Sequence, residues 1–160
     1  MSPPDKTPPV INGWTVLGHP IFARRYVALR DEVRRLKREL EAQVYAQHPT
    51  VKLFAALRRL ITELVPQDPN APEYMLRGPL AQYRRAKGKG LPSRYRLFWI
   101  FSTQAKAIVF LYLNDETTLR KEGTRSDPYA VFGRLVERGE IGADFAENYD
   151  AWKRAMEHEA

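Results

Sequence analysis

Two adjacent runs of strand-forming residues constrain the fold of this 160-residue chain more than any other feature. The first run, Arg94 to Phe101, alternates tyrosine, leucine, tryptophan and phenylalanine with other residues, and the second, Lys106 to Asn114, has an uninterrupted apolar centre. The residues between them, Ser102 to Ala105, can form a turn. Uninterrupted apolar runs are typical of strands that are covered on both faces. We therefore expect this pair of strands to lie in the middle of a sheet.

Two amphipathic helices are predicted before these strands. Apolar residues recur every three or four positions from Phe22 to Val44, which predicts one long helix that ends at Pro49. The same spacing from Val51 to Leu64 predicts a second helix, capped by Thr50 and stopped by Pro66. The short connection between the two predicts an antiparallel helix pair.

Three further segments give weaker signals. Val10 to Gly18 is typical of a strand, with Asn12-Gly13 forming a bulge or a turn at its start. Met75 to Leu80 predicts a short strand, although its Gly-Pro pair disfavours one. Arg84 to Ser93 combines glycine, proline and four cations, which indicates either a mobile basic loop or a wide hairpin.

The end of the chain predicts two more helices. Asp127 is a favourable N-cap, Pro128 suits the first helical position, and Gly139 suits the residue that follows the last turn. Apolar residues at spacings of four, three and four from Phe145 to Met156 predict a final helix that lies on the domain. This order of elements predicts an α+β fold, with a small antiparallel sheet packed against a helix pair and with C-terminal helices.

The length and composition predict a single domain from Val10 to Ala160, preceded by a disordered, proline-rich lead-in from Met1 to Pro9. The sequence has no cysteine, which excludes a disulfide framework, a thiolate zinc site and a cysteine nucleophile. No apolar run is long enough for a signal peptide or a membrane span, so we expect a cytoplasmic protein.

The positive charge of the chain is concentrated in one segment. Tyr74 to Asn114 contains no acidic residue but eight cations, which exceed the net charge of +7 of the whole chain. These cations are Arg77, Arg84, Arg85, Lys87, Lys89, Arg94, Arg96 and Lys106. Cations beside aromatic rings, here Tyr83, Tyr95, Phe98 and Trp99, suit a phosphodiester backbone with unpaired bases. RNA is therefore the first expected ligand.

Three motifs of the chain occur together in one known family. They are Asn12-Gly13-Trp14 with His19-Pro20 and Phe22, then Arg94-Tyr95-Arg96-Leu97-Phe98, then Asn114-Asp115-Glu116 with Thr118-Leu119-Arg120, Gly123, Asp127, Tyr129 and Val131-Phe132. With these motifs the chain, from about Asn12 to Asp144, resembles the YhaV family of toxins from type II toxin-antitoxin systems.

The resemblance implies a member of the RelE-like superfamily, whose small α+β endoribonucleases cleave mRNA, often on the ribosome. It also implies a co-expressed antitoxin of the PrlF type, a swapped-hairpin DNA-binding protein. Toxin and antitoxin together would repress their own operon, so operator DNA would be contacted only through the complex. We expect an acidic antitoxin and no membrane partner.

The resemblance also implies site residues. Arg96 matches the strand arginine of the superfamily and Tyr129 its late tyrosine, while Arg120 and Arg125 compete for the late arginine. We expect Arg96, Arg120, Tyr129 and Lys87 to be catalytic. We expect Arg84, Arg85, Lys89, Arg94 and Arg125 to bind RNA.

The residue types favour a ribonuclease that uses neither a metal nor a cofactor. Such an enzyme needs a base for the 2′-hydroxyl, an acid for the 5′-oxygen, and cations for the charge that develops on the phosphate. Asp115, Glu116 and Asp127 could hold Mg²⁺, but turn and capping roles explain them more simply. His19 and His48 each precede a proline at a helix start, which indicates a local structural role.

Two alternative functions use the same features. A non-catalytic module could bind RNA or the ribosome through the basic segment. A relative with the same fold could instead poison DNA gyrase, although a dense basic patch around Arg96 favours a phosphate ligand.

Overall fold

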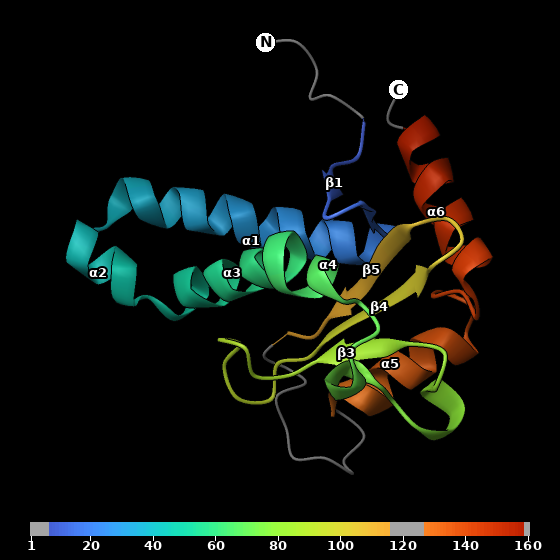
Figure 1. Ribbon diagram of the computed structural model, residues 1–160. Helices are drawn as coiled ribbons and strands as arrows, with labels where there is room; N and C mark the ends of the chain where they lie inside the picture. The colour runs from blue at the N-terminus through green and yellow to red at the C-terminus, as the bar shows by residue number, and fades with distance from the viewer. Residues whose placement is uncertain (1–6, 116–126, 159–160) are drawn as a thin grey trace.

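The computed structural model describes residues 7–115 and 127–158, which form a mixed α/β domain around one five-stranded sheet (Figure 1). The strands are β1 (Val10–Ile11), β2 (Trp14–Gly18), β3 (Arg84–Ala86), β4 (Leu97–Ser102) and β5 (Ala107–Leu113), in the order β1-β2-β5-β4-β3. The predicted pair β4 and β5 thus lies centrally, with β5 in the middle position. The predicted α+β fold class is confirmed.

One strand pairing differs from the expected antiparallel sheet. β2 runs parallel to β5, with Val16 opposite Ile108 and Gly18 opposite Phe110, whereas the other three pairings are antiparallel. A parallel pair needs a long connection, and the helices between β2 and β3 supply one. The spacing of residues in the sequence could not predict that β2 runs parallel to β5.

The first predicted strand is a hairpin. Asn12 and Gly13 have φ values of 51° and 82°, so both central residues of the turn adopt the left-handed conformation that two-residue hairpins favour. β1 and β2 pair across this turn. Of the two expectations for Asn12-Gly13, the turn is correct.

The predicted long helix is interrupted. α1 (Pro20–Glu39) ends where Leu40 becomes extended, and a separate helix, α2 (Ala42–Gln47), follows. The prediction of one helix to Val44 is therefore wrong. No residue of α2 is buried, so no core contact holds this segment in register with α1.

Histidines cap the two helices that begin with proline. Nδ1 of His19 accepts a hydrogen bond from the N–H of Ile21, and Nδ1 of His48 accepts one from the N–H of Thr50, both at 3.1 Å. His48, not Thr50, is thus the N-cap of α3 (Pro49–Arg59). The expected structural role of both histidines is confirmed.

The helix after His48 continues past its predicted stop. α3 widens into a π-helical turn, η1 (Leu60–Leu64), and continues through Pro66 in α4 (Val65–Gln67). Proline lacks an N–H and crowds the carbonyl four residues earlier, which a wider turn relieves.

The strand predicted from Met75 to Leu80 is wrong. Two short 3₁₀ turns, η2 (Pro72–Tyr74) and η3 (Gly78–Leu80), occupy this region, and Met75 makes only an isolated bridge to Arg84. Gly78 has a φ of 68°, which a strand does not allow. Beyond it, β3 pairs with β4, so the basic segment Arg84 to Ser93 belongs to a wide hairpin, as one of its two interpretations predicted.

β4 begins three residues later than predicted. Arg94 has a φ of 70°, and the ladder with β5 starts at Leu97. The predicted strand start at Arg94 is therefore wrong. Arg96 lies immediately before the strand, where the chain enters the sheet.

The helix signals near the end of the chain are confirmed. Asp127 Oδ1 accepts the N–H of Ala130 at 2.8 Å and caps α5 (Pro128–Glu137). Gly139, with a φ of 73°, ends the helix, and the N–H of Glu140 returns to the carbonyl of Leu135. The final helix is α6 (Phe145–His158).

Helices cover both faces of the sheet (Figure 1). α1 and α3 pack on the face that carries Trp99 and Phe110, and α5 and α6 pack on the face that carries Phe98 and Leu111. Phe98, Trp99 and Tyr83 are fully buried, so these three predicted aromatic neighbours of RNA belong to the core. Within the described helices, none is long and apolar enough to cross a bilayer.

Candidate active site

Arg96 and Tyr129 lie together at the edge between the two helical layers. Nε of Arg96 donates a hydrogen bond to the phenol oxygen of Tyr129 at 3.0 Å, and its Cζ lies 5.9 Å from the ring centroid. Arg96 directly precedes β4, and Tyr129 is in the first turn of α5. Folding therefore joins two predicted catalytic residues that come from different motifs of the sequence.

Asn114 fixes the backbone on which Arg96 sits. Its Oδ1 accepts the N–H of Arg96 at 2.7 Å, and its Nδ2 donates to the carbonyl of Arg94 at 3.0 Å. The side chain is fully buried at the end of β5. Because a buried amide must satisfy its own donors and acceptors, these two bonds hold the left-handed residue Arg94 and the next turn in place.

Arg25 contacts the backbone next to Arg96 and Tyr129 from α1, on the other face of the sheet, through the carbonyl of Asn114. Its Nη2 donates to the backbone carbonyl of Asn114 at 3.3 Å. Its Nε is buried and has no hydrogen-bond partner in the protein. A buried guanidinium donor without a protein partner carries a desolvation cost.

Arg85 lies on the other side of Tyr129. It belongs to β3, opposite Phe98, and its Cζ is 5.9 Å from the centroid of the Tyr129 ring. One nitrogen donates to the carbonyl of Glu73 at 3.4 Å, while its buried Nε has no partner. The phenol ring of Tyr129 therefore contacts two guanidinium groups, those of Arg85 and Arg96.

Arg84 is built into the scaffold. Its guanidinium donates twice to Oδ1 of Asn70, at 3.0 and 2.8 Å, and to the carbonyls of Ala81 and Tyr83. It also lies 5.3 Å from the ring centroid of Phe101, and burial lowers the pKa of Arg84 from its ordinary value. The structure thus places Arg84 away from Tyr129, and RNA binding by Arg84 stays a prediction.

The remaining predicted residues occupy the hairpin or fall outside the described chain. Lys89 pairs with Glu73 at 2.8 Å, and the hydrogen bond and charge of that carboxylate raise the pKa of the Lys89 amine. Lys87 and Arg94 are exposed. Arg120 and Arg125 lie outside the residues that the structure describes.

Sequence reasoning missed Arg25 and the role of Asn114. Arg25 is one of many arginines on α1, and no spacing distinguishes it from its solvated neighbours. Asn114 carried a usable signal, because a lone amide ends an otherwise wholly apolar strand. Arg85 and Arg96 meet at the Tyr129 ring, and Arg25 bonds to the neighbouring backbone at Asn114. Guanidinium groups of this kind can bind a phosphodiester beside the Tyr129 hydroxyl.

Comparison with known proteins agrees with this chemistry. A family described as "Toxin with endonuclease activity, of toxin-antitoxin system" matches residues 16–153. The "Ribonuclease toxin YhaV" of Escherichia coli strain K12 is 35% identical over 144 residues, which cover 86% of this chain and 91% of that protein. The "Toxin YhaV" of Escherichia coli O157:H7 has the same identity and coverage. No solved structure matches the chain. The chain therefore belongs to the YhaV family of toxins with endonuclease activity from toxin-antitoxin systems.

Proposed function

We propose that the protein inhibits growth by cleaving mRNA, and that Arg25, Arg85, Arg96 and Tyr129 form the reaction site. The observation that carries this proposal is the hydrogen bond between Arg96 and Tyr129, with a second guanidinium, that of Arg85, on the same ring. The Arg96 bond and the Arg85 guanidinium fix the position of the phenol hydroxyl beside cations that can bind a phosphate. The site therefore combines phosphate binding with a group that can transfer or orient a proton.

The reaction proceeds by attack of the 2′-oxygen of the ribose on the adjacent phosphorus. The 2′-hydroxyl proton goes to a base, and the bond from phosphorus to the 5′-oxygen breaks as that oxygen gains a proton. The products are a 2′,3′-cyclic phosphate and a 5′-hydroxyl end. Arg96, Arg85 and Arg25 stabilise the charge on the phosphoryl oxygens, because a guanidinium stays charged and presents several donors.

Tyr129 is the proposed proton donor or orienting group, and Lys87 is the proposed second proton-transfer group from the exposed hairpin. Arg94, Arg84 and Lys89 are proposed to contact the RNA backbone on either side. Arg120 is proposed as the late catalytic arginine and Arg125 as an RNA-binding residue, with Arg125 as the alternative for the late arginine. No metal and no cofactor take part in this scheme.

The proposed partners follow from the toxin-antitoxin family. They are an antitoxin of the PrlF type, mRNA, and the ribosome as the place of cleavage. Operator DNA would be bound only by the complex, and the protein would act in the cytoplasm.

End-group analysis of cleaved RNA tests the proposed chemistry. The purified toxin is incubated with a defined RNA in EDTA, and with the same RNA carrying a single 2′-deoxy substitution at the cleaved position. We expect EDTA to leave cleavage unchanged and the deoxy substitution to abolish it at that position. A 5′-phosphate product, or activity that returns only with Mg²⁺, would refute the metal-free mechanism.

The same preparation distinguishes the alternative functions. RNA binding without any product would indicate the non-catalytic module. Inhibition of gyrase supercoiling with no RNA product would indicate the gyrase poison.

A further inference from the structure

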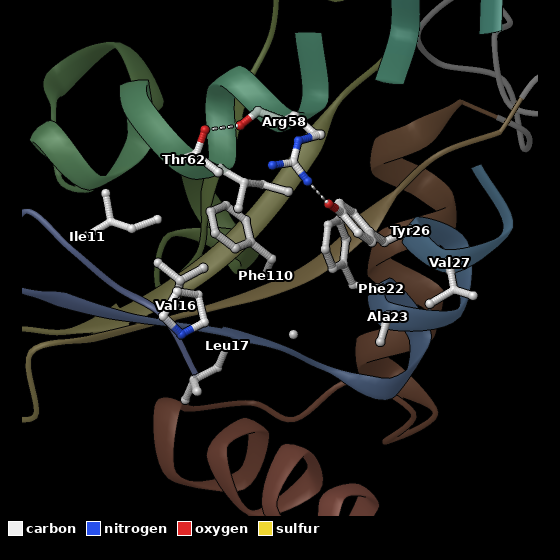
Figure 2. A pocket seen from close by; sticks show the side chains of 13 residues that line it. Ile11, Val16, Leu17, Phe22, Ala23, Tyr26, Val27, Arg58, Thr62 and Phe110 are labelled. Atoms are coloured by element: carbon white, nitrogen blue, oxygen red, sulfur yellow. Dashed lines mark hydrogen bonds between the residues drawn. The ribbon is translucent and has the colours of Figure 1, made fainter. Parts of the chain in front are cut away.

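An apolar groove lies along one flank of α1 (Figure 2). It has a volume of about 410 Å³, within the range of about 300–1,000 Å³ that is usual for ligand pockets. α1 and η1 form its walls, with Phe22, Val27 and Ile61, and the sheet forms its floor, with Val16 and Phe110. The β1–β2 hairpin closes one end.

The groove and the active site face different directions. Ala23 and Val27 line the groove, whereas Arg25 reaches Asn114 at the end of β5. At 100° per residue, Ala23 and Val27 lie on the opposite side of α1 from Arg25. An occupant of the groove would therefore not fill the phosphate site.

One exposed apolar residue extends the groove to the surface. Only four large apolar side chains are strongly exposed in the described ranges 7–115 and 127–158, and one of them lines this groove. Val27, which is 40% exposed, lines the groove. A hollow that continues into exposed apolar surface is typical of a protein-binding site.

Arg58 places a positive charge on the rim of this groove. Its Nη1 donates to the hydroxyl of Tyr26 at 2.7 Å, and both residues line the cavity. No carboxylate of the described chain forms an ion pair with Arg58. The bond to a neutral phenol leaves the charge of the guanidinium available to an acidic partner.

The charges favour the antitoxin over a second copy of the toxin. A symmetric pair through this groove would bring the two Arg58 side chains near one another, which is unfavourable for like charges. The family match places an antitoxin beside the toxin. A segment with apolar side chains and a carboxylate satisfies both the groove and Arg58.

We propose that an acidic segment of the antitoxin docks its apolar side chains in this groove and pairs a carboxylate with Arg58. The proposal rests on the antitoxin partner of the proposed function, not on the ribonuclease chemistry. The groove is an anchor that holds the antitoxin on the toxin independently of whether RNA occupies the arginine site.

Calorimetric titration of the toxin with the protein encoded by the neighbouring open reading frame tests the proposal without RNA. Val27→Asp places a carboxylate in the groove. Val44→Asp is the control, because it makes the same change on α2 at a residue that is 52% exposed and does not line the groove. We expect Val27→Asp to weaken binding about ten- to a hundredfold, as expected for a hot-spot position, and Val44→Asp to leave it unchanged.

Arg58→Glu is the second variant, with Arg59→Glu as its neighbouring control. Arg59 is exposed and pairs with Glu63 within its own helix. We expect a similar loss for Arg58→Glu only, and recovery when a matching antitoxin carboxylate is changed to lysine. Ribonuclease activity of the free toxin and its thermal melting should be unchanged in both groove variants, which separates a docking defect from misfolding.

Two outcomes overturn the proposal. One is wild-type affinity of both Val27→Asp and Arg58→Glu for the antitoxin. The other is a toxin dimer in sedimentation experiments that Val27→Asp dissociates, because the groove would then hold a second copy of this chain. If the wild-type toxin does not cleave RNA, the proposed function is disproved, but the antitoxin-binding result still stands.

Discussion

Nε of Arg96 lies 3.0 Å from the hydroxyl oxygen of Tyr129, although 33 residues separate the two in the chain. The same arginine is held through its backbone N–H by Asn114. Substitution of each member of this trio affects a different property of the protein. Arg96 supplies charge, Tyr129 supplies a hydroxyl, and Asn114 supplies position.

Arg96→Ala should lower the single-turnover rate of RNA cleavage by about 10²–10³, or about 2.7–4 kcal/mol, by analogy with the loss of one oxyanion donor. Growth inhibition should disappear. Lys106→Ala is the matched control, because Lys106 is an exposed cation of the same acid-free segment that lies over Trp14 instead. Equal loss in both variants would mean that general charge, not the geometry of Arg96, drives the reaction.

Tyr129→Phe should fold normally and bind RNA with nearly unchanged affinity, yet cleave it more slowly. The ring keeps its contact with Phe98, at a centroid distance of 5.8 Å, and only the hydroxyl is removed. Single-turnover kinetics, RNA binding and thermal melting should be measured together. Cleavage at the wild-type rate would make Tyr129 a packing residue, and the late-helix contribution would then have to come from Arg120 or Arg125.

Asn114→Ala should reduce both stability and cleavage. It leaves the N–H of Arg96 and the carbonyl of Arg94 without their partner, which costs about 1–3 kcal/mol for each buried group that stays unsatisfied. Urea unfolding measures the stability term. Arg96→Ala is the control, because residue 96 keeps its backbone N–H and therefore its bond to Asn114. Its free energy of unfolding should change less than that of Asn114→Ala.

Acid should destabilise the protein through His19. Burial, and secondarily the charge of Arg24, lowers the pKa of His19 from 6.5 to about 4. The unfolded chain therefore binds this proton first as the pH falls, so His19 contributes stability above pH 6.5 that is lost between pH 6.5 and about 4. The difference corresponds to about 3 kcal/mol at most.

His19→Asn should flatten this part of the stability profile, because asparagine keeps an N-cap acceptor for Ile21 but does not titrate. His48→Asn at the other histidine cap is the control. Urea unfolding from pH 4 to 7 tests the difference. If His19→Asn loses as much stability as the wild type over this range, other groups cause the acid sensitivity.

The antitoxin should compete with RNA for the basic hairpin. Arg85, Lys87 and Arg94 form an exposed or half-exposed cationic surface around the site, and an acidic segment over it would block RNA entry. A fluorescent RNA should dissociate as a catalytically inactive toxin is titrated with antitoxin. Unchanged RNA affinity at saturating antitoxin would place inhibition elsewhere.

Local features of the fold could be predicted from the sequence, whereas features set by distant residues could not. The cap at Asp127 and the stop at Gly139 depend on neighbours within a few positions, and both predictions are confirmed. The predicted start of β4 at Arg94 is wrong because the side chain of Asn114, which follows β5, bonds to the N–H of Arg96 and the carbonyl of Arg94. These two backbone groups therefore do not pair with a neighbouring strand.

The candidate site shows the same division. Arg96 and Tyr129 were found through family motifs, and their contact was not visible in any spacing. Arg25 bonds to the carbonyl of Asn114, which is 89 positions later in the chain. Only the folded structure distinguishes Arg25 from the other arginines of α1.

The contact between Arg96 and Tyr129 also sets when the site comes into being during synthesis. Arg25, Arg85 and Arg96 precede Tyr129 in the chain, and Tyr129 is held by α5, which is made only after the whole sheet. A chain that has not yet emerged through α5 possesses the cations but lacks their hydroxyl partner. The contact between Arg96 and Tyr129 therefore forms late in biosynthesis. An antitoxin already present in the cell has an interval in which it can bind the nascent toxin before this contact is complete.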